Sequence, residues 1–256
     1  MGRLAVAAVG LAVAAPAPTL HISFPEGMSV RQMTDRVAAV RRIAIEKRKL
    51  RPVLTGRSYA VAARAARPPV QFAPRPRSIE GFLFPSLYAF GPSTRASELL
   101  ALQLEAFGRE WAKVDLHAAR ARGRTPYDVL KIASMIERET VAPEERKLVS
   151  AVIYNRLDQD MPLAIDATLR YGLGIQGTRP LTKKQLASES PYNTRLRTGL
   201  PPTPIGNPGT ASMRAAAAPA AVDYLYYVRK PDGVHHFFTA DDEEFCRKAK
   251  EYGYGC

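Results

Sequence analysis

The stretch Lys131-Ile-Ala-Ser-Met-Ile-Glu-Arg-Glu-Thr140 places two carboxylates, Glu137 and Glu139, at the end of an otherwise apolar segment. Residues 125–128 read Thr-Pro-Tyr-Asp, which combines an N-cap hydroxyl, a proline suited to the first helical position and an early acid. The apolar residues that follow recur at helical spacing: Val129, Ile132, Ala133 and Ile136. We therefore predict a helix with one buried face that ends at the two acids.

The position of these two acids at the end of a helix should raise their pKa. The last turn of a helix carries partial negative charge, and burial disfavours a carboxylate further, so a proton can be held near neutral pH. A general acid needs that property. Glu139 should lie at one edge of the apolar face and Glu137 at the other, so they are not expected to face each other. The alternative is that both are ordinary solvated acids beside Lys131 and Arg138.

The composition indicates a basic globular protein of one or two domains. The chain has 256 residues and a net charge of +13. Residues 31–77 hold thirteen Lys or Arg against two acids, so most of the excess charge lies there. Such a segment could meet nucleic acid, anionic lipid or an anionic cell-wall polymer, or it could simply be a solvated basic helix and linker. No nucleic-acid recognition motif accompanies it, so we expect no nucleic-acid partner.

The cysteine and histidine patterns predict no metal centre and no cofactor. Cys246 and Cys256 are the two cysteines, and their spacing matches no zinc motif. A disulfide and two free thiols both remain open for them. None of the four histidines has a metal-binding spacing.

The front of the chain predicts a leader, a small module and a linker. Residues 4–15 form an apolar run that is too short to span a bilayer and fits a secretory signal or a buried strand. Residues 20–24 alternate as a strand does, and Ser29 should cap a helix. The region 43–77 then reads as helix followed by a Pro-rich linker.

The remainder predicts a mixed set of helices and short strands, and hence an α+β fold. Residues 199–209 are rich in proline and glycine, which suits either a rigid wall of a polymer cleft or a plain connector. The expected elements are an extended segment at 80–90, helices at 97–111, 143–158, 182–187, 212–218 and 242–252, a short strand at 163–166 delivering Asp166, and a hairpin of 224–228 with 235–239.

Several motifs in order resemble those of the MltG-type, YceG-like endolytic murein transglycosylases. The resemblance runs from about residue 20 to about residue 240. The matching segments are 24–27 (Phe-Pro-Glu-Gly), 80–85 (Glu-Gly-Phe-Leu-Phe-Pro), 133–139 (Ala-Ser-Met-Ile-Glu-Arg-Glu), 152–157, 163–168, 191–194 (Pro-Tyr-Asn-Thr), 199–202 and 207–209.

The resemblance implies a site and a domain plan. Glu139 falls on the family's catalytic glutamate, and the implied substrate-binding residues are Glu137, Asp166, Tyr192 and Asn193. The implied ranges are a leader at 1–18, a partial LysM-like module at 19–66, a linker at 67–78 and a catalytic domain at 79–256. Ala167 stands where the family often has proline, and the histidine usual after the last strand is absent from 241–245.

The resemblance also implies an activity and a location. The expected reaction cleaves the β-1,4 bond between N-acetylmuramic acid and N-acetylglucosamine without water and leaves 1,6-anhydro ends. Expected partners are peptidoglycan glycan strands and peptidoglycan synthases, at the extracytoplasmic face of the cytoplasmic membrane in the cell envelope. The alternatives are a water-using muramidase and a non-catalytic wall-binding or scaffold protein.

Overall fold

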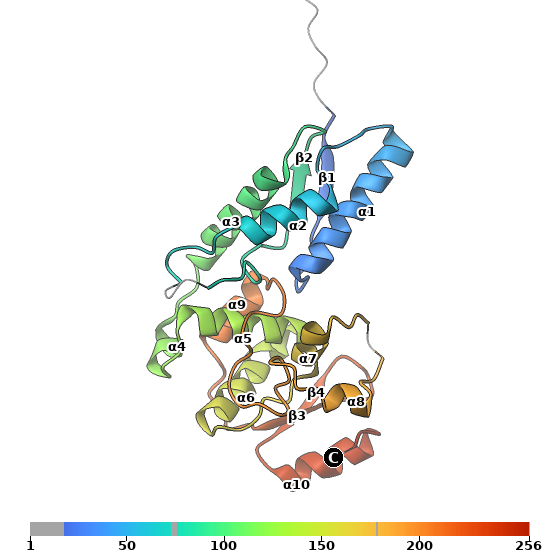
Figure 1. The fold of residues 1–256 in the computed structure, drawn as a ribbon. Coiled ribbons are helices and arrows are strands. Elements are labelled where there is room, and N and C mark those ends of the chain that lie inside the picture. The colour runs from blue at the N-terminus through green and yellow to red at the C-terminus, as the bar shows by residue number, and fades with distance from the viewer. Residues whose placement is uncertain (1–17, 73–75, 178, 256) are drawn as a thin grey trace, which may run out of the picture.

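The computed structural model describes residues 18–72, 76–177 and 179–255, arranged as two bodies, one above the other in Figure 1. The predicted leader falls almost wholly on residues outside this description. The upper body contains β1 (Leu20–Ser23), α1 (Val30–Arg48), α2 (Gly56–Ala65), β2 (Leu87–Phe90) and α3 (Ala96–Trp111). The lower body contains α4 (His117–Ala121), α5 (Pro126–Glu139), the 3₁₀ helix η1 (Pro143–Glu145), α6 (Arg146–Asp158), α7 (Asp166–Leu173), α8 (Lys183–Leu186), α9 (Thr210–Ala217), β3 (Tyr226–Arg229), β4 (His236–Thr239) and α10 (Asp242–Glu251).

The upper body is held by a strand pair of distant segments. β1 pairs antiparallel with β2, so that Leu20 lies opposite Phe90, and α2 packs against both α1 and α3. Ser29 caps α1 as predicted, because its hydroxyl accepts from the backbone N–H of Gln32. The predicted linker at 67–78 separates α2 from β2 in sequence. The predicted domain ranges stay a prediction, although β2 and α3 lie with the upper body.

The lower body is built around α5. This helix begins where the sequence predicts, since the Thr125 hydroxyl accepts from the backbone N–H of Asp128 in a capping box. Its face from Val129 to Ile136 is buried, and it packs against α6, α7 and α9. The predicted second helix is also present, with the 3₁₀ helix η1 as its first turn. The end of α5 therefore opens at a short break between two packed helices.

Two predicted elements differ from the structure. Asp166 is the first residue of α7 and does not lie on the predicted short strand. Among the described residues, the preceding segment forms one isolated bridge, between Pro162 and Thr198, and this pairing does not continue into a strand. An acid in a first helical turn is also favoured by the helix dipole. Of the extended segment at 80–90, only residues 87–90 form a strand.

The other predicted helices and the hairpin are present, and the fold is α+β. Ten α-helices, one 3₁₀ helix and four short strands in two pairs make up the described part of the chain. None of these helices combines the length and apolar character that a membrane crossing needs. Cys256 lies outside the described residues, so the question of its pairing with Cys246 stays open.

Candidate active site

Glu139 is the last residue of α5, and two side chains from β3 meet it. The hydroxyl of Tyr227 donates to Oε2 of Glu139 at 3.4 Å, and Nη2 of Arg229 donates to the Glu139 carbonyl oxygen at 3.1 Å. Tyr227 and Arg229 are two residues apart on a strand, so they project from the same face. The hairpin thus covers the end of α5 with one hydroxyl and one cation.

The pKa of the Glu139 carboxyl is raised above its ordinary value. Burial is the largest cause, and the negative charge of Asp166 adds to it. The cation of Arg229, the backbone N–H of Ala167 and the hydroxyl of Tyr227 oppose the rise by favouring the carboxylate. Desolvation therefore favours the protonated form of Glu139, and the neighbouring donors can stabilise its carboxylate.

The hairpin is fixed to the break after α5 by a buried pair. The backbone N–H of His236 donates to Oε1 of Glu145 at 2.9 Å, and Nδ1 of His236 lies 2.7 Å from Oε2. The His236 ring also meets the Tyr227 ring edge-on, with centroids 5.3 Å apart. Burial lowers the pKa of His236, although Glu145 acts in the opposite direction. The η1 turn thereby positions the strand that carries Tyr227.

Glu137 points to a different part of the molecule. Its Oε2 accepts from the backbone N–H of Gly209 at 2.9 Å, at the N-cap of α9. The neighbouring carboxyl of Glu26 has a raised pKa, first because of burial and then because of Glu137. The two acids of α5 therefore have separate surroundings, as their spacing predicts, and Glu137 helps to fix the loop before α9.

Asp166 lies near Glu139, and it is paired with Arg195. Nε and Nη2 of Arg195 donate to Oδ1 of Asp166 at 3.0 and 2.7 Å, and both side chains remain partly exposed. The pair stands at the start of α7, whose Ala167 N–H reaches Glu139. Asp166 and Glu139 are thus brought together, whereas Asp166 and Glu137 show no shared contact among the described residues.

Tyr192 and Asn193 are neighbours in sequence with different environments. Asn193 is buried, and its Nδ2 donates to the carbonyl oxygens of Leu186 and Ser188 at 2.9 and 2.8 Å. Its amide therefore orders the chain between α8 and Tyr192. Tyr192 is half-buried, and its hydroxyl lies 2.8 Å from that of Thr203.

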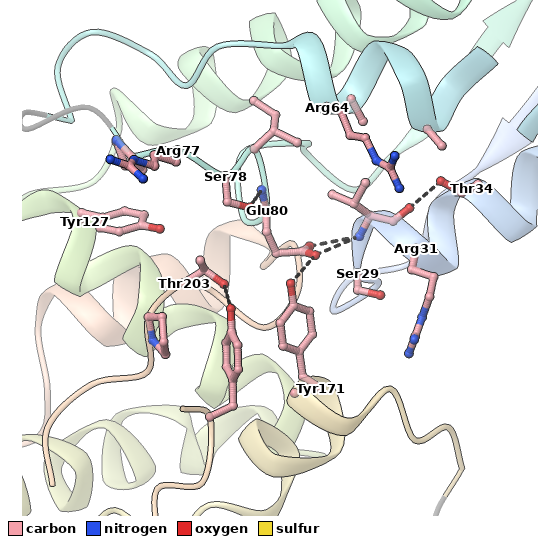
Figure 2. Close-up of a pocket in the computed structure, with 18 residues that line it drawn as sticks. Ser29, Arg31, Thr34, Arg64, Arg77, Ser78, Glu80, Tyr127, Tyr171 and Thr203 are labelled. Carbon is pink, nitrogen blue, oxygen red and sulfur yellow. Dashed lines mark hydrogen bonds between the residues drawn. The ribbon is translucent and has the colours of Figure 1, made fainter. Parts of the chain in front are cut away.

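Tyr192 lines a cavity of about 1010 Å³ between the two bodies (Figure 2). Glu80 lies at its centre and accepts from the backbone N–H of Val30 at 3.0 Å and the hydroxyl of Tyr171 at 3.1 Å. Burial raises the pKa of Glu80 to about 7. Neither Glu139 nor Asp166 belongs to the lining. The cavity and the surroundings of Glu139 are therefore two distinct places in the fold.

The sequence matches the YceG-like family model over residues 5–251. The chain belongs to the YceG-like family. It is 36% identical over 174 residues to a protein of Bacillus subtilis named endolytic murein transglycosylase, and 29% identical over 178 residues to one of that name from Streptococcus pneumoniae. These matches cover 68% of this chain but 47% and 32% of the two relatives, so this chain spans about half of their length or less.

The fold is also similar to that of a solved member of the family. The crystal structure of a YceG-like protein from Listeria monocytogenes superposes with a TM-score of 0.73 at 30% sequence identity. The match covers 90% of this chain and 75% of the Listeria chain. The relation to the YceG-like family therefore extends to nearly the whole described structure.

Sequence reasoning missed four residues around the acid of this YceG-like protein: Glu145, Tyr227, Arg229 and His236. The hairpin itself is predicted from its alternation and turn, but its pairing with α5 spans about ninety residues. The available signal is the alternation of Tyr227 and Arg229, which puts a hydroxyl and a cation on one strand face. That this strand face contacts Glu139 follows from tertiary packing and cannot be read from the local sequence.

Proposed function

We propose that this YceG-like chain is an endolytic murein transglycosylase. It would cleave the β-1,4 bond between N-acetylmuramic acid and N-acetylglucosamine inside glycan strands and leave 1,6-anhydro ends. The observation that carries this proposal is the partly buried carboxyl of Glu139, whose pKa is raised by desolvation while Tyr227 and Arg229 contact the residue. The names of the Bacillus and Streptococcus relatives point to the same activity.

A single acid can perform both halves of this reaction. Protonated Glu139 donates its proton to the glycosidic oxygen, and the bond from that oxygen to C1 of the muramoyl residue breaks with its electron pair on the oxygen. The 6-hydroxyl oxygen of the same sugar then bonds to C1, and the Glu139 carboxylate takes the hydroxyl proton. Acid–base help of this kind contributes roughly 10²–10⁴-fold in rate. No second carboxylate has to act as nucleophile or base.

The surroundings suit an acid that must alternate between two charge states. Burial favours the protonated form before the bond breaks, and the N–H of Ala167, the hydroxyl of Tyr227 and the cation of Arg229 stabilise the carboxylate afterwards. We assign Asp166 to the electrostatic tuning of Glu139. Tyr192 is assigned to substrate contact away from the cleaved bond, since it lines the cavity between the two bodies. Glu137 and Asn193 are assigned to positioning the loops around the site.

We further propose the biological setting that the family resemblance implies. Residues 19–66 of the upper body would act as a partial LysM-like module that holds a glycan strand for the lower body. The protein would work at the extracytoplasmic face of the cytoplasmic membrane, on peptidoglycan strands and beside peptidoglycan synthases. The basic charge of residues 31–77 supports attraction to an anionic envelope polymer.

Product analysis tests the activity. Purified protein and its Glu139→Gln and Glu144→Gln variants are incubated with uncrosslinked glycan strands, and the fragments are identified by mass spectrometry. We expect internal fragments that end in 1,6-anhydromuramic acid from the unaltered protein and from Glu144→Gln, with a loss of at least about 100-fold in Glu139→Gln. Glu144 is an exposed acid on η1, so it controls for the removal of a charge nearby.

Other products would select an alternative. Reducing muramic ends would make the protein a water-using muramidase. Strand binding without cleavage would favour a wall-binding or scaffold protein. Equal cleavage by Glu139→Gln would overturn the assignment of the acid.

A further inference from the structure

The cavity between the two bodies is lined by positive charge that no acid among the described residues pairs with. Three arginines from separate segments line it, namely Arg31 on α1, Arg64 on α2 and Arg77 before Glu80. All three are exposed, and none of them makes an ion pair or hydrogen bond within the described residues. Cations that line one hollow without a partner are suited to an anionic ligand.

The one acid in the lining does not supply the missing partner. Oε1 of Glu80 accepts from the Val30 N–H at 3.0 Å and from Nδ2 of Asn207 at 3.1 Å, while Oε2 accepts from Tyr171 at 3.1 Å. The carboxyl is thus used within the fold, and burial raises its pKa to about 7. Figure 2 shows Glu80 at the centre and Arg64 and Arg77 apart from it at the upper edge.

Tyrosines on the lower body form the opposing wall. Tyr171 and Tyr192 meet edge-to-face with ring centroids 5.0 Å apart, and Tyr127 contributes a third ring. The hydroxyls of Tyr171 and Tyr192 have partners in the fold, whereas that of Tyr127 has none among the described residues. The wall therefore offers apolar faces and one available hydroxyl to a ligand.

A smaller hollow adjoins the cavity at the end of α2 and adds one more arginine. A second hollow of about 540 Å³ shares Arg64, Pro76 and Arg77 with the first and adds Arg67. The combined space exceeds what one sugar needs and suits an extended segment several residues long. Its lining does not include Glu139, so the bound group would not be the sugar that is cleaved.

We propose that this cavity binds the carboxylate-bearing peptide stem of a murein strand whose glycan lies at Glu139. Guanidinium groups bind carboxylates with two parallel hydrogen bonds, and the tyrosine wall accommodates the apolar parts of a peptide. This inference rests on the proposed function, because the peptide stem belongs to the murein strand that the proposed activity cleaves. It adds that the protein distinguishes strands that carry peptide stems from strands that have been stripped of them.

Binding to a non-cleaving protein tests this inference. In the Glu139→Gln background, affinity is measured for short glycan strands with stems and for the same strands after enzymatic removal of the stems. We expect the stem-bearing strand to bind about tenfold more tightly, which is the scale of one or two charge-assisted contacts. Adding Arg64→Gln and Arg77→Gln should abolish that difference.

Matched variants separate recognition from folding and from general charge. Arg57→Gln removes an exposed arginine of α2 that does not line the cavity, and it should keep the tenfold difference. Tyr127→Phe removes only the available hydroxyl and should reduce the difference about threefold, with an unchanged melting temperature. Equal affinity for both strands, or a difference that survives the double arginine change, would overturn the inference.

Two further outcomes concern lipid binding and the cleavage activity itself. Salt-sensitive binding to phosphatidylglycerol vesicles that needs Arg64 and Arg77, with no effect of stems, would replace the peptide by a lipid headgroup and so reject the proposal. Failure of the unaltered protein to cleave any strand would reject the proposed function instead. The binding comparison does not depend on cleavage, so the two failures are distinguishable.

Discussion

Glu145 and His236, ninety-one residues apart in sequence, form a buried two-point contact between η1 and β4. The backbone N–H of His236 donates to Oε1 of Glu145, and its Nδ1 lies 2.7 Å from Oε2. This contact holds the hairpin whose Tyr227 and Arg229 reach Glu139. It therefore links the stability of the lower body to the environment of the acid.

Glu145→Gln should destabilise the protein strongly. Weakening a buried hydrogen-bonded contact of this kind costs about 1–3 kcal/mol, because the groups of His236 stay buried without the carboxylate that they meet. The free energy of unfolding is measured by urea denaturation near neutral pH. The control is Glu144→Gln, since Glu144 meets His235 at 3.4 Å with both side chains exposed, and its loss should cost less than about 0.5 kcal/mol. Similar losses in the two variants would contradict the structural role of the buried pair.

Arg229→Gln should move the pH profile of cleavage upward. In the proposed reaction the rate requires protonated Glu139, so kcat/KM should fall as pH rises through the Glu139 pKa. Arg229 opposes the raised pKa, and its removal therefore raises that pKa further and shifts the falling limb to higher pH. The profile is measured with glycan strands for the unaltered protein and the variant. A limb that moves to lower pH, or does not move, would show that Arg229 does not tune the acid.

Asn193→Ala should act through stability. The change removes two buried hydrogen bonds to the carbonyl oxygens of Leu186 and Ser188, which should cost about 1–3 kcal/mol. Thermal and urea unfolding measure this loss, and steady-state kinetics measure KM. A direct substrate contact would give the opposite pattern, with a raised KM and an unchanged free energy of unfolding.

Glu80 should make the protein less stable as pH rises from about 4.5 to about 7. Burial raises the folded-state pKa from 4.5 to about 7, so in this range the unfolded chain has released a proton that the folded chain still holds. The shift corresponds to about 3 kcal/mol lost across the window, and the loss is complete above it. Glu80→Gln should remove this dependence of the free energy of unfolding on pH, because an amide does not titrate. The substitution can also change the stability by an amount that is the same at every pH. The stability difference between the two proteins, measured at several pH values, should therefore grow in favour of Gln as pH rises.

Two glycines in one loop should respond differently to alanine. A Cβ on Gly206 would lie 2.5 Å from the backbone oxygen of Gly27, so the backbone must shift at a cost of about 1–3 kcal/mol. A Cβ on Gly209 would meet the end of the Glu26 side chain, which is exposed and can turn away. Gly206→Ala should therefore lower the melting temperature more than Gly209→Ala does, and equal effects would argue against the close approach of the two loops.

Local patterns in the sequence determine most of the helices. Residues 125–128 carry the cap of α5, and the apolar spacing that follows determines its buried face, because both depend on atoms within a few residues. The separation of Glu137 from Glu139 is equally local, since it follows from the helical repeat. The same reasoning is wrong at Asp166, where a short strand is predicted and a helix begins instead.

Only the tertiary structure decides what these elements meet. Three contacts join segments that lie far apart in the chain: β1 pairs with β2, Glu145 contacts His236, and Tyr227 contacts Glu139. Local propensity carries no information about such distant pairings, because they follow from how apolar faces pack together. The sequence by itself therefore places Glu137 and Glu139 at the end of α5 and predicts Glu139 as the acid, whereas packing determines the burial, the pKa and the neighbours of Glu139.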